Sequence, residues 1–249
     1  MEPTPSWKLL TSGDPATFVA AVCREAKEHP AVHHPYLVRL SQGDLPDIQG
    51  ALRDYAFQYS FYGTDFVSYL EGVIGSLPFE RQRDVIRENL EEEKGDPKST
   101  DLDRIPHVKL FQMFREAIGA NEEYRKTNKA CTTVLVWRDL FLQKCNSRQL
   151  GVALGGMGIG TEYVVPTIYG YILKAIREHT KLSREDAYFF ELHSQCDDHH
   201  AEDLNNIAVE LASEPDVREA LRFGALSALN LRKAFWDLML ARAVDMKPA

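Results

Sequence analysis

The stretch FFELHSQCDDHHAE occupies residues 189–202 and places His193, Asp197 and His200 four and three residues apart. On a helix with 3.6 residues per turn, positions i, i+4 and i+7 fall within an arc of roughly 60°, so two imidazoles and a carboxylate share one face. Nitrogen and oxygen donors in this mixture suit iron, manganese or zinc better than calcium or magnesium. The stretch therefore predicts a metal-binding helix, with a polar helix carrying histidines on its solvated side as the alternative.

Apolar residues recur at helical spacing along most of the chain, and no convincing run of alternating β-branched residues indicates a strand. We therefore expect an all-α fold. The pattern predicts helices over residues 15–29, 46–75, 79–94, 106–119, 121–146, 149–179, 183–212 and 215–245.

Composition limits the classes of protein to consider. A chain of 249 residues with 44% hydrophobic content can bury one sizeable core, so we expect one domain over 1–249, with 1–14 as a loosely ordered arm. The net charge of −8 comes from charges mixed along the chain. Because no basic stripe is present, binding to a nucleic-acid backbone is not expected.

Cysteine usage and hydropathy indicate a cytoplasmic protein. The cysteines are scattered, form no CxxC pair, and follow no apolar leader segment. The most apolar stretch, 150–173, is interrupted by glycines, a proline and Glu162, so it predicts a buried helix rather than a membrane span.

Glu162 is the only charged residue between Arg148 and Lys174. An isolated buried carboxylate is costly unless a metal ion or a hydrogen-bonded cation compensates it, so Glu162 is a candidate ligand or the partner of a buried arginine. Glycines just before it allow a ligand or another backbone to approach closely, although they equally suit tight helix packing.

Two further candidates come from the region 86–107. Ile86, Leu90 and Glu93 share one helical face, so Glu93 continues an apolar stripe inward, with Glu92 as the reserve candidate. His107 follows a loop and begins the next helix, where a histidine is as often a cap or core residue as a ligand.

Three carboxylates and three imidazoles on separate helices are sufficient for two metal ions. A carboxylate-bridged pair in a helical core favours dioxygen activation, and two-metal hydrolysis is the competing use. The chain contains neither the ExxH pairs of ferritin-like bundles nor a His-Asp dipeptide of phosphohydrolases.

The same residues resemble the haem-oxygenase-like di-iron oxidases, also described as iron-containing redox enzymes and related in fold to thiaminase II. The similar segments, in chain order, are HHPYLVRLSQGDL (33–45), NLEEEKG (89–95), HVKLF (107–111), EYVVP (162–166) and FFELHSQCDDHH (189–200). The loop between Glu93 and His107 is longer here than in several members.

The resemblance implies a haem-oxygenase-like bundle of seven to eight helices. It also implies two Fe(II) ions that react with O2, held by Glu93, His107, Glu162, His193, Asp197 and His200. Expected reactions on a small amino acid, amine or carboxylate are N-oxygenation, desaturation or cyclisation, and oxidative C–C cleavage, often in specialised metabolite biosynthesis. An external electron donor and a homodimer are compatible with it.

The substrate pocket is predicted less directly. Tyr59, Tyr62, Phe66 and Tyr169 are candidates for its lining, with plain core packing as the alternative for each. Arg138 is a candidate anchor for a substrate carboxylate, or else the partner of a core carboxylate such as Glu162.

Two other functions fit the same fold. One is a metal-free thiaminase-like hydrolase, in which Cys145 or Cys131 would have to be the nucleophile, although neither lies in a recognisable motif. The other is a non-enzymatic helical interaction protein whose metal site is vestigial or structural.

Overall fold

A computed structural model describes residues 13–195 and 198–247, and no strand occurs among them. This confirms the predicted all-α fold. The elements are α2 (Pro15–Glu28), α3 (Pro35–Gln42), α4 (Ile48–Gly63), α5 (Phe66–Ser76), α6 (Glu80–Lys94), the 3-10 turn η1 (Leu102–Arg104), α7 (His107–Ala117), α8 (Glu122–Thr127), α9 (Thr132–Cys145), α10 (Val152–Leu154), the π-helix η2 (Gly155–Glu162), α11 (Val165–His179), α12 (Tyr188–Gln195), α13 (Asp198–Leu211) and α14 (Pro215–Val244).

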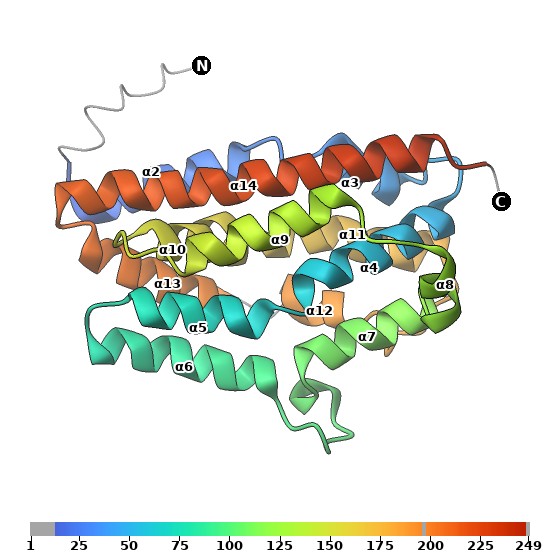
Figure 1. Ribbon diagram of the computed structural model, residues 1–249, viewed down its shortest axis with the longest axis horizontal. Coiled ribbons are helices and arrows are strands. Elements are labelled where there is room, and N and C mark those ends of the chain that lie inside the picture. Colours follow the sequence, from blue (N-terminus) through green and yellow to red (C-terminus); the bar gives the residue numbers. More distant parts are fainter. Residues whose placement is uncertain (1–12, 196–197, 248–249) are drawn as a thin grey trace.

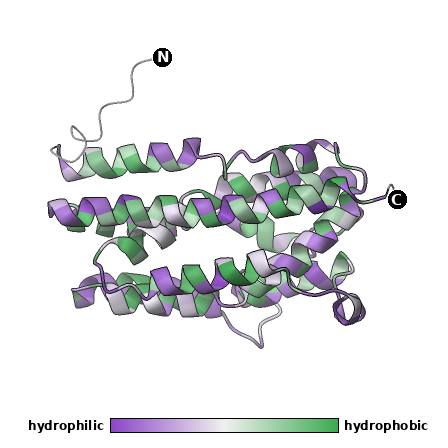
Figure 2. Cartoon of the chain, turned by 45° about the horizontal axis from the view of Figure 1, so that its top comes forward, coloured by the Kyte–Doolittle hydropathy of each residue, from purple (hydrophilic) through white to green (hydrophobic). Residues whose placement is uncertain are grey.

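The helix α14 runs along the long axis of the molecule and contacts α2, α3, α4, α9, α10 and η2 (Figure 1). On the opposite side, α5 packs against α6, and α7 contacts α6 and α12. Green and purple residues alternate around individual helices in Figure 2, as expected where each helix buries one face. Buried side chains from nearly all of these helices join one hydrophobic cluster.

The π-helix η2 sets the direction of Glu162, its last residue. The Tyr163 amide donates to the carbonyl of Gly158 at 2.9 Å, a step of five residues. A Cβ atom on Gly155 would lie 2.0 Å from the carbonyl oxygen of Leu221, and one on Gly160 would lie 2.7 Å from that of Ala225. The glycines thus permit backbone contact with α14, and the predicted single helix over 149–179 is instead α10, η2 and α11.

Two other long helices predicted from the sequence are broken. The helix predicted over 46–75 ends at Gly63, where the Thr64 hydroxyl donates to the carbonyl of Ser60 at 2.8 Å. The helix predicted over 121–146 is interrupted between α8 and α9. There the buried Gln58 side chain donates to the carbonyl of Lys129 at 3.1 Å and accepts from the amide of Cys131 at 2.9 Å. This distant glutamine satisfies backbone groups that a continuous helix would have paired internally.

The helix α3 was not predicted. His34 caps it by accepting from the Tyr36 amide at 3.2 Å, Pro35 opens it, and Gly43 ends it at a positive φ of 73°. The helix predicted over 183–212 is represented by α12 and α13, with residues 196–197 lying outside the described part. The predicted arm 1–14 lies mostly outside it too, except that Asp14 caps α2 through the Thr17 amide.

No helix in the ranges 13–195 and 198–247 combines the length and the apolar character needed to cross a membrane.

Candidate metal centre

Glu93 lies on the buried face of α6. It shares that face with Ile86 and Leu90, and only 7% of the residue is exposed. The side chain of the neighbouring Glu92, in contrast, is 67% exposed. The inward phase predicted from the apolar stripe is therefore confirmed, and it separates Glu93 from the other acidic residues of the run.

The loop after α6 returns the chain to Glu93. Gly95 has a φ of 49°, and a Cβ atom there would lie 2.6 Å from the carbonyl oxygen of Arg104. The Asp96 amide donates to the same carbonyl at 2.7 Å, which closes the loop at its base. His107 is consequently the first residue of α7 and is buried beside Glu93, despite the length of the loop.

His193 reaches the same point from α12. Its Nδ1 lies 2.7 Å from the carbonyl oxygen of Phe189. Because a carbonyl only accepts, Nδ1 carries the proton and the lone pair of the neutral ring is on Nε2. Backbone bonding at one ring nitrogen is how metal-binding histidines are usually oriented.

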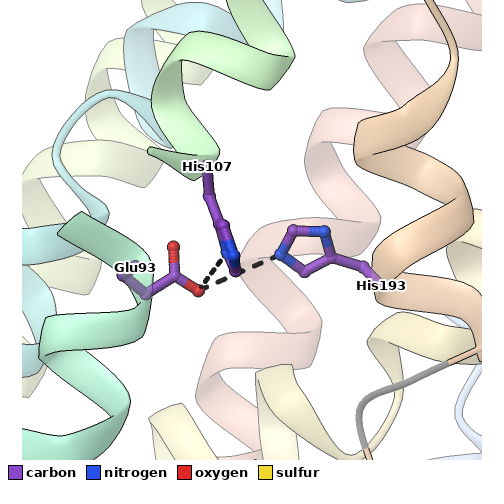
Figure 3. A group of neighbouring side chains, drawn as sticks. All are labelled: Glu93, His107 and His193. Carbon is purple, nitrogen blue, oxygen red and sulfur yellow. Dashed lines mark ion pairs between the residues drawn. The ribbon is translucent and has the colours of Figure 1, made fainter. Parts of the chain in front are cut away.

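Glu93, His107 and His193 point toward one another in Figure 3. Glu93 Oε1 lies 2.9 Å from Nδ1 of His107 and 3.9 Å from Nε2 of His193. One potential ligand atom from each residue fits within 4.8 Å of the others. Two atoms bonded at about 2.1 Å to the same ion are at most about 4.2 Å apart, so the three side chains need to move only slightly closer together to bind one ion.

The contact between His107 and Glu93 is not an ordinary hydrogen bond. Although the two atoms are 2.9 Å apart, the buried Nδ1 of His107 lacks hydrogen-bond alignment to any acceptor. Buried polar atoms are normally satisfied, and an ion between the three side chains would satisfy this one. The donor set therefore fits a single metal ion of the iron or zinc type.

The electrostatics of the cluster keep Glu93 ionised. Burial raises the pKa of its carboxyl, but the contacts with His107 and His193 outweigh that effect and lower the pKa to about 2. A carboxylate is the protonation state that a metal ion requires.

Beside the cluster lies a cavity of about 220 Å³, lined mainly by aromatic and aliphatic side chains. Glu93, His107, His193 and Glu162 all contribute to its wall. Glu162 is buried at the end of η2, as the sequence predicted, but it is not one of the three clustered residues.

Three of the predicted pocket residues, Tyr59, Phe66 and Tyr169, line this cavity. The other two do not. The ring of Tyr62 stacks on that of Trp137 with centroids 3.9 Å apart, so Tyr62 is a core residue. Arg138 bonds to its neighbour Asp139 and is not among the residues that line the cavity. Its predicted role as an anchor for a substrate carboxylate therefore gains no support from this cavity, and its pairing with Glu162 stays a prediction.

His200, another predicted ligand, is not one of the three clustered residues. Nε2 of His200 lies 2.8 Å from Oε2 of Glu92, in a polar depression that also includes His107, Asp96, Asp103 and Arg104. Asp197 lies outside the described residues. The two predicted histidine ligands of the 189–202 stretch therefore line different pockets: His193 lines the cavity, and His200 lines the polar depression.

Two cavity residues that sequence reasoning missed are Phe111 and Phe189. Phe111 follows His107 by four residues, and Phe189 precedes His193 by four. The spacing that places residues on one helical face would have identified both, had it been applied outward from the proposed ligands.

Comparisons with known proteins agree with this architecture. The sequence model of a family described as "Iron-containing redox enzyme" matches residues 53–233, a range that contains all six predicted ligands. A search of curated proteins finds no match.

Solved structures share the fold at low sequence identity. A TenA homologue from Pseudomonas syringae has a TM-score of 0.70 and 16% identity, over 97% of this chain and 98% of that chain. A CADD-like protein of unknown function from Nostoc punctiforme has a TM-score of 0.73 and 15% identity, over 91% and 99%. A domain of unknown function with a heme oxygenase-like fold, from Shewanella denitrificans, has a TM-score of 0.66 and 17% identity, over 90% and 89%.

Proposed function

Because the chain belongs to the family of iron-containing redox enzymes, we propose that it is a non-haem di-iron oxidase or oxygenase. It uses molecular oxygen to oxidise a small amino acid, amine or carboxylate, in specialised metabolism. The observation that supports this most strongly is the buried Glu93, His107 and His193 cluster, which opens directly on an apolar cavity. Such a cavity with a few convergent polar groups is the usual form of a small-molecule site.

Glu93, His107 and His193 would hold the first iron ion. Glu162, on the same cavity wall, and the predicted ligands Asp197 and His200 would hold the second. Two bound Fe(II) ions would supply electrons for the reduction of dioxygen, and an external donor would return the oxidised ions to Fe(II). To bind that ion, His200 would have to leave Glu92, whose Oε2 lies 2.8 Å from its Nε2.

The chain's own residues supply orientation and a dry environment. The Phe189 carbonyl fixes the ring of His193, and the phenyl rings of Phe111 and Phe189 keep bulk water from the metal ligands. Exclusion of water strengthens electrostatic interactions in the cavity and limits side reactions of an activated oxygen species. The cavity beside the cluster would hold the substrate.

The hydrolase alternative requires a cysteine nucleophile in the cavity. Neither Cys145 nor Cys131 lines it, and burial raises the pKa of Cys145 well above its ordinary value. A thiol that stays protonated in an apolar core is a poor nucleophile. These two cysteines therefore give no support to thiaminase-like hydrolysis.

Anaerobic titration with Fe(II), read by metal analysis after desalting, tests the proposal. We expect about two iron ions per chain for the native sequence, and loss of tight binding in His193→Ala because a central ligand is removed. His33→Ala is the matched control, since His33 is exposed, pairs with Tyr171 and belongs neither to the cluster nor to the cavity lining. A native protein that retains no iron would refute the oxidase function. If His193→Ala retains as much iron as the native protein, the assignment of the ligands is refuted.

A further inference from the structure

Arg232 of α14 is a buried guanidinium. Only 1% of the residue is exposed, and neither Nε nor Nη1 makes a hydrogen bond. Within residues 13–195 and 198–247, no aspartate or glutamate forms an ion pair with it. Its charge instead lies over the rings of Trp137 and Tyr62, at 5.4 and 6.0 Å from their centroids. Cation–π contacts return only part of the solvation that a buried charge loses, so this arginine is costly to the fold.

Arg232 interacts with Tyr59, a residue of the cavity wall. Burial raises the pKa of the Tyr59 hydroxyl, while the charge of Arg232 and its hydrogen bond to that hydroxyl lower it. The oxygen of Tyr59 is in turn 2.7 Å from the oxygen of Tyr169. Both tyrosines line the cavity, and the ring of Tyr169 contacts that of His193 with centroids 5.8 Å apart.

The two tyrosines have one more hydroxyl proton than their mutual hydrogen bond uses. A guanidinium can only donate, so the Tyr59 oxygen accepts from Arg232. Either tyrosine oxygen can be the donor in the bond between them, and the hydroxyl proton that this bond does not use has no acceptor among the described residues. A buried donor without an acceptor is unfavourable. When a ligand of the cavity accepts the proton of Tyr169, Tyr59 donates to the Tyr169 oxygen in its turn.

We infer that Tyr169, Tyr59 and Arg232 form an anion-binding subsite that receives the carboxylate of the cavity's ligand. The Tyr169 hydroxyl donates to a carboxylate oxygen, and the positive charge of Arg232 acts on it through Tyr59. This inference rests on the proposed function only in naming that ligand as the substrate, and it narrows the substrate class to small carboxylates, amino acids included. The subsite gives Arg232 the kind of carboxylate-binding role that the sequence suggested for Arg138.

The nearby negative charges must be considered with this subsite. Glu162 also acts on the Tyr59 hydroxyl and raises its pKa, and Glu93 lies on the same cavity wall. Both carboxylates would repel an anion in the metal-free chain. Metal ions held by these residues would neutralise that charge and leave the positive charge of Arg232 in excess, so the anion should bind more tightly after iron loading.

Calorimetric titration with matched carboxylates and amides tests the inference. The probes are benzoate against benzamide and hexanoate against hexanamide, each with metal-free protein and with anaerobically Fe(II)-loaded protein of measured iron content. We expect at least one carboxylate to bind at least about tenfold more tightly than its amide, and Tyr169→Phe to remove about tenfold in affinity for that carboxylate. Tyr171→Phe, on the same helix but bonded to His33, should leave the affinity unchanged.

A second variant separates a binding role of Arg232 from a structural one. Arg232→Met should abolish the preference for carboxylate over amide while leaving the thermal midpoint equal or higher, because it removes an unpaired buried charge. A lower midpoint with an unchanged preference would assign Arg232 to the fold alone and overturn the inference.

The other contrary outcomes are equal binding of carboxylate and amide, binding of neither, or carboxylate binding that Tyr169→Phe does not alter. If the protein takes up no iron, the proposed function fails, and the metal-free titrations decide the anion subsite separately.

Discussion

Glu92→Gln tests how the second half of the metal site is assembled. Oε2 of Glu92 lies 2.8 Å from Nε2 of His200, which is a predicted iron ligand. If His200 must leave Glu92 to bind the second ion, the contact competes with the metal. Removing the negative charge of Glu92 should then strengthen binding of the second iron.

The expected gain in affinity for the second iron follows from the solvent exposure of Glu92 and His200. The side chain of Glu92 is 67% exposed and that of His200 is 9% exposed, so solvent screens the attraction on one side only. Pairs of this kind contribute about 0.5–1 kcal/mol. Loss of that competition should raise the affinity for the second iron by roughly two- to fivefold, since 1.4 kcal/mol corresponds to tenfold.

Stepwise anaerobic Fe(II) titration measures both affinities. Glu91→Gln is the matched control, because it makes the same change of charge one residue away on the exposed side chain that pairs with Lys94. The first iron should bind equally in all three proteins. Weaker binding of the second iron in Glu92→Gln, by tenfold or more, would refute the reasoning and make Glu92 itself a ligand.

Three further predictions concern packing, acid sensitivity and the cysteine. Gly155→Ala should destabilise the protein by about 3 kcal/mol or more, because the added Cβ would meet the backbone of Leu221. The control Gly170→Ala, whose Cβ would have nothing within 4 Å, should be neutral or stabilising by up to about 1 kcal/mol. Urea unfolding measures both variants, and equal effects would contradict the close contact between η2 and α14. The metal-free protein should lose stability as the pH falls from about 4.5 to about 2, because folding lowers the pKa of Glu93 and only the ionised carboxylate is stabilised. In Glu93→Gln, the free energy of unfolding should lack this decrease. The same dependence of the free energy of unfolding on pH in both proteins would argue against an ionised Glu93 in the cluster. Cys145→Ala should cost about 1 kcal/mol of stability and leave iron-dependent oxygen consumption at an oxygen electrode intact. Loss of oxygen consumption in a variant that still folds would contradict the assignment of Cys145 to the core alone.

The sequence predicted the helices well where one face alone decides the structure. The apolar stripe of Ile86 and Leu90 correctly placed Glu93 inward and Glu92 outward. Breaks that depend on distant residues were not predictable in this way, since the gap between α8 and α9 is stabilised by Gln58 from another helix. The π-helix before Glu162 likewise depends on contact with α14, which no local pattern reveals.

The site shows the same division. His107, Glu93 and His193 could be chosen from spacing and resemblance, and the structure brings them together. Tyr59 and Tyr62 are both buried and lie three residues apart, and only the stacking of Tyr62 on Trp137 separates core from cavity. Arg232 carried a usable signal that was missed. It occurs four residues after Ala228 and four before Trp236, so a charge stands in the phase of a buried stripe.

Diffraction at the iron absorption edge, from crystals reconstituted with Fe(II) without oxygen, tests the central claim most directly. We expect two anomalous peaks per chain, the first at about 2.1 Å from side-chain atoms of Glu93, His107 and His193. The second should lie next to Glu162, with His200 moved from Glu92 to bind it. Iron bound away from Glu93, His107 and His193, or no iron in crystals soaked with excess Fe(II), would contradict the account.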